Sequence, residues 1–389
     1  MTVRVLHVLV PEPEGSVGGA DAHVRDLAAA QLNSGTSSPV VFATLSPSFA
    51  RQVRATGVEC RSTAGAGARA VLPTLRALLR ERADVVHSHG YDATWWTVAA
   101  LATLRRPPPL VVTCHGWIET SPKLRVMSAL DRLANRSAAG IVLVSEELVP
   151  VALRHAARAR AIAVVPNGVP IRPLRDRGDA RCALGLPSDR LVVAAMGRLT
   201  TEKRHDVFVE AAARIAKRRM DVVFVLAGEG PLRKALVDEA RRAGLGDRFV
   251  LLGCVADPDA VFAAANVVVQ PSNTETTSRV ILEAMAQARP VVATAVGGTP
   301  SIVRSGTTGR LIPPGDVDAL MTATLELLDD PAAASRIGLA ARARVNERFA
   351  VAEMAAAVDD VYRAVLGGLP RRPGTWTRDR HRPATKEGR

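Results

Sequence analysis

The sequence has few aromatic residues and no long hydrophobic run. Phenylalanine, tryptophan and tyrosine make up 3% of its 389 residues, which leaves few rings on which nucleic-acid bases could stack. No apolar segment approaches the roughly 20 residues that span a bilayer. The N-terminal VRVLHVLV ends at Pro11 without a small-residue cleavage site. We therefore interpret this segment as a first β-strand and not as a signal peptide.

Cysteine is scarce and irregularly spaced. The four cysteines form no C-x-x-C pair, which argues against a zinc site or a disulfide framework and favours a reducing, cytoplasmic location. Cys114 stands beside His115, an arrangement that raises the alternative of a thiol nucleophile. Because Cys114 ends an apolar strand, we favour a buried structural role for it.

Several nucleotide and metal motifs are missing. The glycine loop before residue 20 lacks the G-x-G-x-x-G spacing, GEGPLR at 228–233 is only a G-x-G, and no P-loop is present, so we expect no dinucleotide cofactor and no ATPase. Asp257-Pro258-Asp259 imitates the D-x-D with which some sugar transferases hold a metal. An N-cap aspartate followed by proline explains it better, and we expect neither a metal nor another cofactor.

Positive charge is abundant and unevenly distributed. Of the net charge of +13, residues 1–170 carry +6, residues 171–370 carry +2, and the last 19 residues carry +5. A basic surface favours an acidic partner, such as nucleic acid, anionic lipid or a phosphorylated substrate. Peripheral contact with the anionic inner face of a membrane is one hypothesis, and a merely solvated basic tail is the alternative.

Short β-branched runs alternate with helical segments in two successive series. The first series extends over residues 1–169, and the second follows a connection at 170–190 that is rich in proline, arginine and aspartate. The rhythm predicts an α/β protein with two Rossmann-like, doubly wound parallel sheets. We place the second domain at 170–348, and we expect the tail at 370–389 to be disordered.

The segment PSNTETTSRVILEAMA, residues 271–286, joins a strand to a helix. A hydroxyl residue at Thr277 or Ser278 is a good N-cap, and the free amides of the first helical turn attract an anion. Glu275 and Glu283 flank this helix start, where carboxylates can accept hydrogen bonds from hydroxyls, and Arg279 lies between them. A nucleotide sugar offers both phosphate and hydroxyls, whereas a capped helix with solvated glutamates is the simpler alternative.

Other polar residues also follow predicted strands, and parallel sheets bind ligands at the carboxyl ends of their strands. Arg198 and Lys203 follow the strand LVVAAM and suit a diphosphate, although a basic loop is often only solvated. His115 follows PLVVTC, where catalytic and structural roles are equally open. His87 and His89 also end a strand, but without a neighbouring carboxylate we favour packing over metal binding.

Taken together, these segments resemble the retaining family-4 glycosyltransferases, which have the GT-B fold. ETTSRVILEAMA matches their E-x7-E signature, and the similarity covers about residues 4–365. Further segments match in the same order along the chain: VGGAD, VVHSHGYDA, VVTCHGW, VVPNGV, GRLTTEKRHDVFVEAA, VFVLAGEGPLR and FVLLGCV. The resemblance implies two domains that face a cleft, with the acceptor mainly on the first and the nucleotide sugar on the second. It also implies that a helix within 349–368 returns to the first domain.

The resemblance implies a set of residues for the donor diphosphate. Arg198 and Lys203 would hold it, and the amides around Thr277 and Ser278 would meet the distal phosphate. The Gly18-Gly19 pair would form the loop that faces the diphosphate. These glycines also permit a close backbone approach at the start of a helix.

The resemblance implies contacts with the rest of the donor as well. Glu275 and His115 would act at the donor sugar as catalytic residues. Glu283 would bind the ribose, and Val255 would lie near the base. Arg279 would be an additional phosphate or carboxylate ligand.

The sequence departs from the family pattern in two segments. The family usually has Gly-Phe-Gly after the first glutamate, whereas this chain has Thr276-Thr277-Ser278 followed by Arg279, and aspartate stands at residue 21 where glutamate is common. The loss of both glycines restricts the loop that would hold the donor. The identity of the donor therefore does not follow from the motif.

The resulting functional hypothesis is a metal-independent hexosyltransferase in polysaccharide or glycolipid biosynthesis. It would move a sugar from a UDP- or GDP-type nucleotide sugar to a hydroxyl of a glycan, glycolipid or small-molecule acceptor, with retention of anomeric configuration. A GT-B nucleotide-sugar epimerase is one alternative. A basic nucleic-acid-binding protein is the other, and the scarcity of aromatic residues argues against it.

Overall fold

The computed structural model describes residues 2–10, 18–43, 46–63, 68–81, 83–116, 122–156, 158–367 and 375–377. The chain divides into two compact units. Unit 1 comprises residues 1–168 and 351–389, and unit 2 comprises residues 169–350. The boundaries expected from the sequence, after residues 169 and 348, lie within two residues of these divisions.

Unit 1 is built on a sheet with the strand order β14-β7-β6-β5-β4-β1-β2-β3. All neighbouring strands are parallel except for the edge strand β14, which pairs antiparallel with β7. The strands are β1 Val3–Leu9, β2 Ser37–Ala43, β3 Glu59–Ser62, β4 Val85–His89, β5 Leu110–Cys114, β6 Gly140–Leu143, β7 Ala161–Val164 and β14 Thr375–Thr377.

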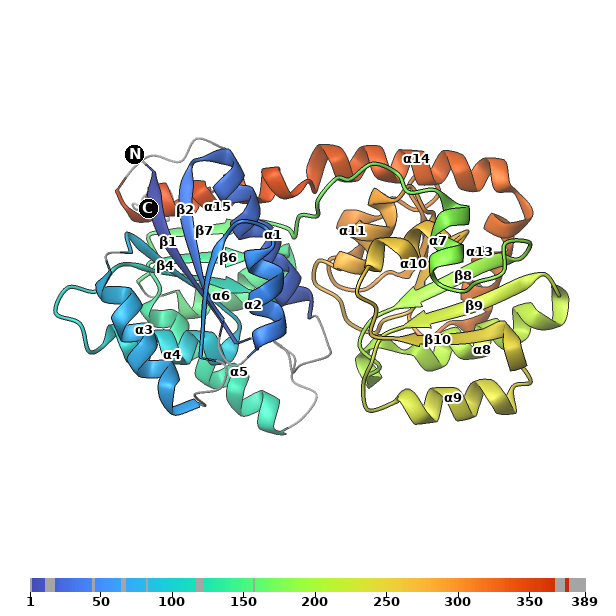
Figure 1. The fold of residues 1–389 in the computed structure, drawn as a ribbon, viewed down its shortest axis with the longest axis horizontal. Helices are drawn as coiled ribbons and strands as arrows, with labels where there is room; N and C mark the ends of the chain where they lie inside the picture. The colour runs from blue at the N-terminus through green and yellow to red at the C-terminus, as the bar shows by residue number, and fades with distance from the viewer. Residues whose placement is uncertain are drawn as a thin grey trace, which may run out of the picture. The chain divides into compact units, whose positions relative to one another are not determined.

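Helices cover both faces of this sheet (Figure 1). They are α1 Gly19–Ser34, α2 Pro47–Arg54, α3 Val71–Arg80, α4 Tyr91–Leu101, α5 Pro122–Ala134, α6 Val149–His155 and α15 Val351–Val365. Successive side chains of β1 point to opposite faces of the sheet, as strand geometry requires. Leu6 and Val8 pack in the core with α3 and α4, whereas Val5 packs with α15. This arrangement confirms the predicted doubly wound fold.

Unit 2 repeats the pattern with an all-parallel sheet of strand order β10-β9-β8-β11-β12-β13. Its strands are β8 Leu191–Met196, β9 Val222–Ala227, β10 Phe249–Gly253, β11 Val267–Gln270, β12 Val291–Thr294 and β13 Arg310–Ile312. Its helices are α7 Arg177–Ala183, α8 His205–Arg218, α9 Arg233–Arg242, α10 Pro258–Ala264, α11 Arg279–Ala286, α12 Thr299–Ile302, α13 Val317–Asp329 and α14 Pro331–Arg348.

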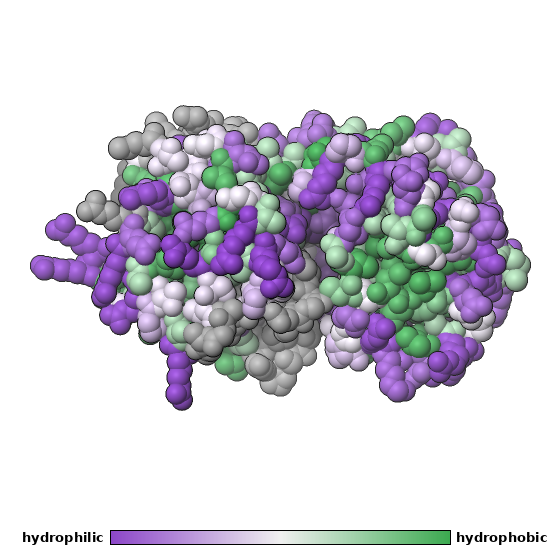
Figure 2. Space-filling model, viewed as in Figure 1, coloured by the Kyte–Doolittle hydropathy of each residue, from purple (hydrophilic) through white to green (hydrophobic). Residues whose placement is uncertain are grey.

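Two hydrophobic clusters fill the two sides of this second sheet. Val193 and Ala195 of β8 pack with α8, α9 and α13, whereas Val192 and Ala194 pack with α7, α10, α11 and α14. The edge strand β10 is less covered, because residues 249–252 are only half-buried. Figure 2 shows hydrophobic residues gathered on this part of unit 2.

The structure differs from the sequence-based expectation in the C-terminal tail. Residues 375–377, expected to be disordered, form β14 on the open edge of β7. The Thr-Trp-Thr sequence suits a strand because threonine and tryptophan have high β-propensity. The other residues of the tail lie outside the described part of the chain. Among the described residues, no helix combines the length and hydrophobicity needed to span a bilayer.

A buried polar network crosses the core of unit 1. The Asp359 carboxylate on α15 accepts hydrogen bonds from Gln31 Nε2 at 2.7 Å and from Ser37 Oγ at 3.1 Å. Gln31 Oε1 is 2.9 Å from His7 Nε2, and His7 Nδ1 is 3.0 Å from His89 Nε2. This series links α15 to β4 through α1 and β1.

The carboxylate at one end of the network determines the proton positions along it. A carboxylate only accepts, so Gln31 must present its NH₂ to Asp359 and its oxygen to His7. His7 Nε2 therefore carries the proton, and its Nδ1 accepts from His89 Nε2. The neutral His89 ring is left with a hydrogen-bond acceptor at Nδ1, and this atom has no hydrogen-bond partner among the described residues.

The buried histidines predict acid sensitivity of unit 1. Burial lowers the pKa of His7 to about 4 and the pKa values of His87 and His89 well below their ordinary range, whereas all three titrate near 6.5 when unfolded. The unfolded state therefore binds more protons below about pH 6.5, and stability falls as the pH drops towards 4. Each of these histidines contributes up to about 1.4 kcal/mol per pH unit in that window.

Urea unfolding at about pH 7, 6 and 5, monitored by tryptophan fluorescence, measures this effect. The signal is specific, because all four tryptophans (residues 95, 96, 117 and 376) belong to unit 1. A free energy of unfolding that stays constant or rises from pH 7 to pH 5 would contradict the prediction.

Candidate functional site

The predicted donor residues of unit 2 lie at the carboxyl edge of its sheet. Strands β8 and β11 are parallel neighbours, so the loops that follow Met196 and Gln270 leave the sheet at the same edge. The first loop carries Arg198 and Lys203, and the second carries Glu275. This edge is where open α/β sheets bind ligands.

Lys203 and Glu275 are in direct contact across these two loops. Lys203 Nζ lies 2.7 Å from Glu275 Oε1, and their side chains are 20% and 7% exposed. Gln270 Nε2 and Ser272 Oγ donate to the same oxygen at 2.9 and 2.7 Å. All three donors meet at Oε1, and the hydrogen bonds found among the described residues leave the other carboxylate oxygen, Oε2, without a donor.

Main-chain contacts hold the two loops together. Asn273 N donates to the carbonyl of Glu202 at 2.9 Å, and the Glu275 carbonyl accepts from Gly298 N at 3.1 Å. Arg198 NH2 lies 3.2 Å from Glu202 Oε1. The two cations and Glu275 therefore belong to one connected group.

Glycines bring a third loop against this group. Gly228, after β9, has φ 141°, and a Cβ built there would lie 1.9 Å from the Gly197 carbonyl oxygen. No other residue fits such a backbone contact. This packing explains the G-x-G of residues 228–230, which is not a dinucleotide motif here. Beneath Gly197, burial and the Lys203 charge lower the pKa of His205 to about 4.

The start of helix α11 forms the other side of the site. Ser278 is the N-cap residue, as the sequence predicts, but its side chain makes no capping hydrogen bond. Thr277, Ser278 and Arg279 are all buried. Arg279 NH2 lies 2.9 Å from Glu283 Oε1, a pairing that offsets the unfavourable position of a cation in the first turn of a helix.

Val255 lies farther along the same edge, just after β10. It is partly buried and packs against the core cluster on the α10 side of the sheet. The nearby Asp257 is the N-cap residue of α10 with Pro258 in the first turn, the position predicted for it. Asp257 and Asp259 pair with Arg175 and Arg172, an arrangement that differs from a D-x-D metal site.

The remaining candidates, Gly18, Gly19 and His115, belong to unit 1. Gly18 is the N-cap of α1, and its backbone N–H donates to Asp21 Oδ2 at 3.2 Å. A Cβ at Gly19 would have no atom within 4 Å. The described residues therefore leave space at Gly19, which is compatible with the predicted close approach of a ligand. Residues 11–17 of the same loop lie outside the described residues.

His115 follows β5 and belongs to a group of histidine rings. Its centroid lies 4.8 Å from that of His23 and 6.1 Å from that of His89. His23 Nδ1 is 2.9 Å from Asn167 Oδ1, and the lone pair of His89 is fixed at Nδ1 by the buried network. His115 is half-buried and the other two are buried, so a ligand would reach the group from the His115 side.

Two sets of histidines in the described part of the chain have the proximity of metal ligands. In His7, His87 and His89, and in His23, His89 and His115, one ring nitrogen of each lies within 4.8 Å of the others. His87 makes hydrogen bonds at both nitrogens, to Tyr362 at 2.6 Å and to Thr113 at 2.7 Å. This fits the packing role favoured for it, and only the set that contains His115 has an approach from outside.

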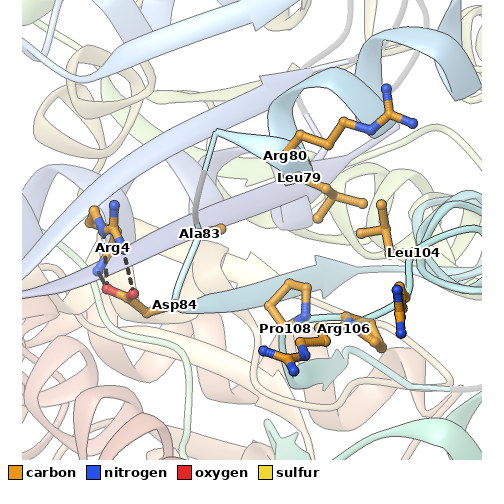
Figure 3. Close-up of a pocket in the computed structure, with 10 residues that line it drawn as sticks. Arg4, Leu79, Arg80, Ala83, Asp84, Leu104, Arg106 and Pro108 are labelled. Carbon is orange, nitrogen blue, oxygen red and sulfur yellow. Dashed lines mark hydrogen bonds and ion pairs between the residues drawn. The ribbon is translucent and has the colours of Figure 1, made fainter.

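A separate open cavity of about 390 Å³ lies in unit 1 around Arg4, Asp84 and Pro108 (Figure 3). These residues lie near the start of strands β1, β4 and β5, the edge opposite to His115. The Asp84 carboxylate is held by Arg4, whose NH2 lies 2.7 Å away. Arginines dominate the lining, and no nucleophile is present among the lining residues, so we do not place the chemistry there.

Sequence reasoning missed the residues that support the site. Ser272 and Gln270 hold Glu275, Asn273 joins the two loops, and His23 lies against His115. Ser272 stands three residues before Glu275 at the end of a strand, which is a usable signal. Nothing in the spacing of His23 indicates its contact with His115, because this contact depends on how α1 packs on the sheet.

Both halves of the chain match models of known protein families. A family model for glycosyl transferases group 1 matches residues 190–330, and one for Glycosyltransferase Family 4 matches residues 17–172. Together the two matches include most of both units.

Individual relatives agree with these matches. The D-inositol 3-phosphate glycosyltransferase of Streptomyces avermitilis is 32% identical over 74% of this chain and 67% of its own length. The 2-deoxystreptamine glucosyltransferase of Streptomyces kanamyceticus is 32% identical over 74% of this chain and 80% of its own. The chain spans 60% of another inositol 3-phosphate enzyme, from Mycolicibacterium paratuberculosis.

Solved structures show the same fold. Anabaena Alr3699/HepE in complex with UDP and glucose has a TM-score of 0.76 at 24% identity, over 92% of this chain and 98% of that one. Sucrose-phosphate synthase from Thermosynechococcus elongatus also has a TM-score of 0.76 at 24% identity, over 94% of this chain and 99% of that one.

These matches cover both units. The chain belongs to the family-4 (group 1) glycosyltransferases and has the GT-B fold.

Proposed function

We propose that this glycosyltransferase binds a nucleoside diphosphate sugar on unit 2 and transfers the sugar to an acceptor hydroxyl with retention of configuration. The observation that carries the proposal is the contact between Lys203 and Glu275, 2.7 Å apart at the carboxyl edge of the sheet. In the proposal, Lys203 binds the diphosphate and the Glu275 carboxylate beside it binds sugar hydroxyls. The UDP complexes of Anabaena Alr3699/HepE support a uridine donor, and GDP is the alternative.

In this proposal, cations and amides stabilise the leaving group. Breaking the bond between sugar and phosphate leaves extra negative charge on the diphosphate. Arg198 and Lys203 are fixed donors beside that charge, and the amides at the start of α11 add partial positive charge. Arg279 contributes a further cation in the same turn, and its pairing with Glu283 partly neutralises this charge.

The carboxylates orient the donor. Glu275 Oε2 accepts from sugar hydroxyls while Oε1 stays bound to Lys203, Gln270 and Ser272. Glu283 accepts from the ribose, and Val255 contacts the base. The leaving phosphate takes the proton of the acceptor hydroxyl, so no separate protein base is required.

Unit 1 contributes the acceptor side of the reaction. His115 contacts the donor sugar, and the Gly18-Gly19 backbone faces the diphosphate. His89 Nδ1 is a fixed hydrogen-bond acceptor near His115 and suits a hydroxyl of either substrate. The acceptor is a hydroxyl of a glycan, a lipid-linked sugar or a small molecule such as the D-inositol 3-phosphate and 2-deoxystreptamine named for the relatives.

The first prediction concerns donor binding. UDP-glucose or another nucleoside diphosphate sugar raises the melting temperature, because a ligand that binds only the folded state stabilises it. Lys203→Ala weakens this effect, with a Kd at least about ten-fold higher, through loss of one phosphate contact. Lys217→Ala, which removes an exposed lysine from α8 of the same unit, is the matched control. Equal shifts in both variants would remove Lys203 from the diphosphate site.

The second prediction concerns turnover. Lys203→Ala lowers kcat by on the order of 10²–10³, the usual cost of losing a donor to developing charge. Nucleotide release with saturating donor and a panel of acceptors measures this effect, with circular dichroism as the check on folding. Near-normal turnover in a folded variant would contradict the mechanism.

The third prediction concerns metal removal. Activity persists after treatment with EDTA and gel filtration, because Arg198, Lys203 and the helix amides neutralise the diphosphate without an ion. Assays before and after chelation, with and without added Mg²⁺ or Zn²⁺, measure this. Loss of activity that Zn²⁺ restores would overturn metal independence and point to His23, His89 and His115 as ligands.

A further inference from the structure

Helix α5 of unit 1 exposes its hydrophobic side chains. Val126, Leu130 and Leu133 are 59%, 42% and 52% exposed, and spacings of four and three residues place them on one face of the helix. Leu153 of α6, which contacts α5, is 57% exposed. Four of the nine exposed large hydrophobic residues of the described chain therefore belong to two adjacent helices.

The buried residues of α5 include polar side chains besides Ala134, whereas an ordinary surface helix buries its large hydrophobic residues. Ser128 and Asp131 are buried, and Asn135, just after the helix, is buried as well. Asn135 Nδ2 donates to Asp131 Oδ2 at 3.2 Å. A helix that buries an aspartate while it exposes leucines has a hydrophobic face that the described residues leave largely uncovered.

Arginines surround the hydrophobic face. Arg125 and Arg136 on the α5 side and Arg154 on α6 are exposed. Arg132, Arg136 and Arg154 lie close to one another around His155: after burial, their three charges are the causes that lower the pKa of this histidine. We call the exposed hydrophobic residues of α5 and α6 and these arginines the α5–α6 face.

The charge of the α5–α6 face discriminates between occupants. A second copy of this chain would bring the same arginines together, and like charges oppose such an interface. The exposed acids nearby, Glu146 and Glu147 before α6, are fewer than the surrounding arginines. Leucines flanked by arginines suit the interfacial region of an anionic bilayer. There the leucines can contact acyl chains, and the arginines can pair with lipid phosphates.

We propose that the α5–α6 face docks this enzyme on anionic lipid membranes. Val126, Leu130, Leu133 and Leu153 enter the boundary between headgroups and acyl chains, and the arginines contact lipid phosphates. The inference goes beyond the proposed function, since it concerns where the enzyme works and is independent of the sugar that it transfers. It also gives a role to part of the positive charge in the first half of the chain.

Co-sedimentation of the full chain with vesicles tests the docking. The protein should bind vesicles with about 30% phosphatidylglycerol in phosphatidylcholine and not vesicles of phosphatidylcholine alone. Raising the salt from about 0.1 M to about 1 M should weaken binding, because salt screens exposed charges. A chain that stays in the supernatant with both vesicle types would overturn the proposal.

Paired variants assign the binding to the face. Leu130→Gln with Leu133→Gln should weaken vesicle binding at least ten-fold, and Leu174→Gln with Leu339→Gln, which changes two exposed leucines of unit 2, should not. Arg136→Gln with Arg154→Gln should weaken it similarly, whereas Arg218→Gln with Arg242→Gln removes equal charge from unit 2 and should have little effect. All these sites are exposed, so the variants should keep their melting temperatures.

The other outcomes are equally informative. Vesicle binding that survives both helix variants would contradict the proposal and point to another basic segment, such as residues 371–389. A wild-type dimer that dissociates in the leucine variant without any vesicle binding would identify a second copy as the occupant instead. The leucine variant should keep the donor-induced rise in melting temperature, so failure of docking and failure of the proposed function can be distinguished.

Discussion

The contact between Lys203 and Glu275 is the interaction on which the unit 2 site depends. Two charged side chains so little exposed are costly to desolvate unless they are paired and hydrogen-bonded, and Gln270 and Ser272 add hydrogen bonds to the carboxylate of the pair. In the proposed function, this pair sets the spacing between the group that would bind the diphosphate and the group that would bind the sugar before any ligand arrives. Such preorganised charge stabilises a transition state without reorganisation during the reaction. The close backbone packing of Gly228 against Gly197 keeps the supporting loops in position.

Much of the fold could be predicted from the sequence, and the reasons for the failures are physical. Strands such as β5 and β9 are apolar runs rich in β-branched residues and are buried on both faces, and their pattern identifies them. Strands β3 (ECRS) and β13 (RLI) were not predicted, because they are short and lack such a run. They are strands because a neighbouring strand offers an edge with which to pair. The same holds for β14, which pairs with β7.

The candidate site could be predicted only in part. The positions after strands identified Arg198, Lys203, Glu275 and His115, because the carboxyl ends of parallel strands meet at one edge. The supporting contacts of Glu275 and the tautomer of His89 depend on side chains from several elements, whose meeting no local spacing encodes. The sequence therefore predicts which residues would carry the chemistry, and the structure adds the contacts that fix their orientation.

Helix α15 has a consequence for how the protein is made. It follows unit 2 in the chain but belongs to unit 1, where Asp359 and Tyr362 complete hydrogen bonds to buried polar groups of the core. A ribosome synthesises the chain from its N-terminus, and domains usually fold in that order. Here all residues of unit 2 are synthesised before α15. Until that helix emerges, part of the hydrophobic core of unit 1 stays uncovered. That interval is when chaperones would be needed most.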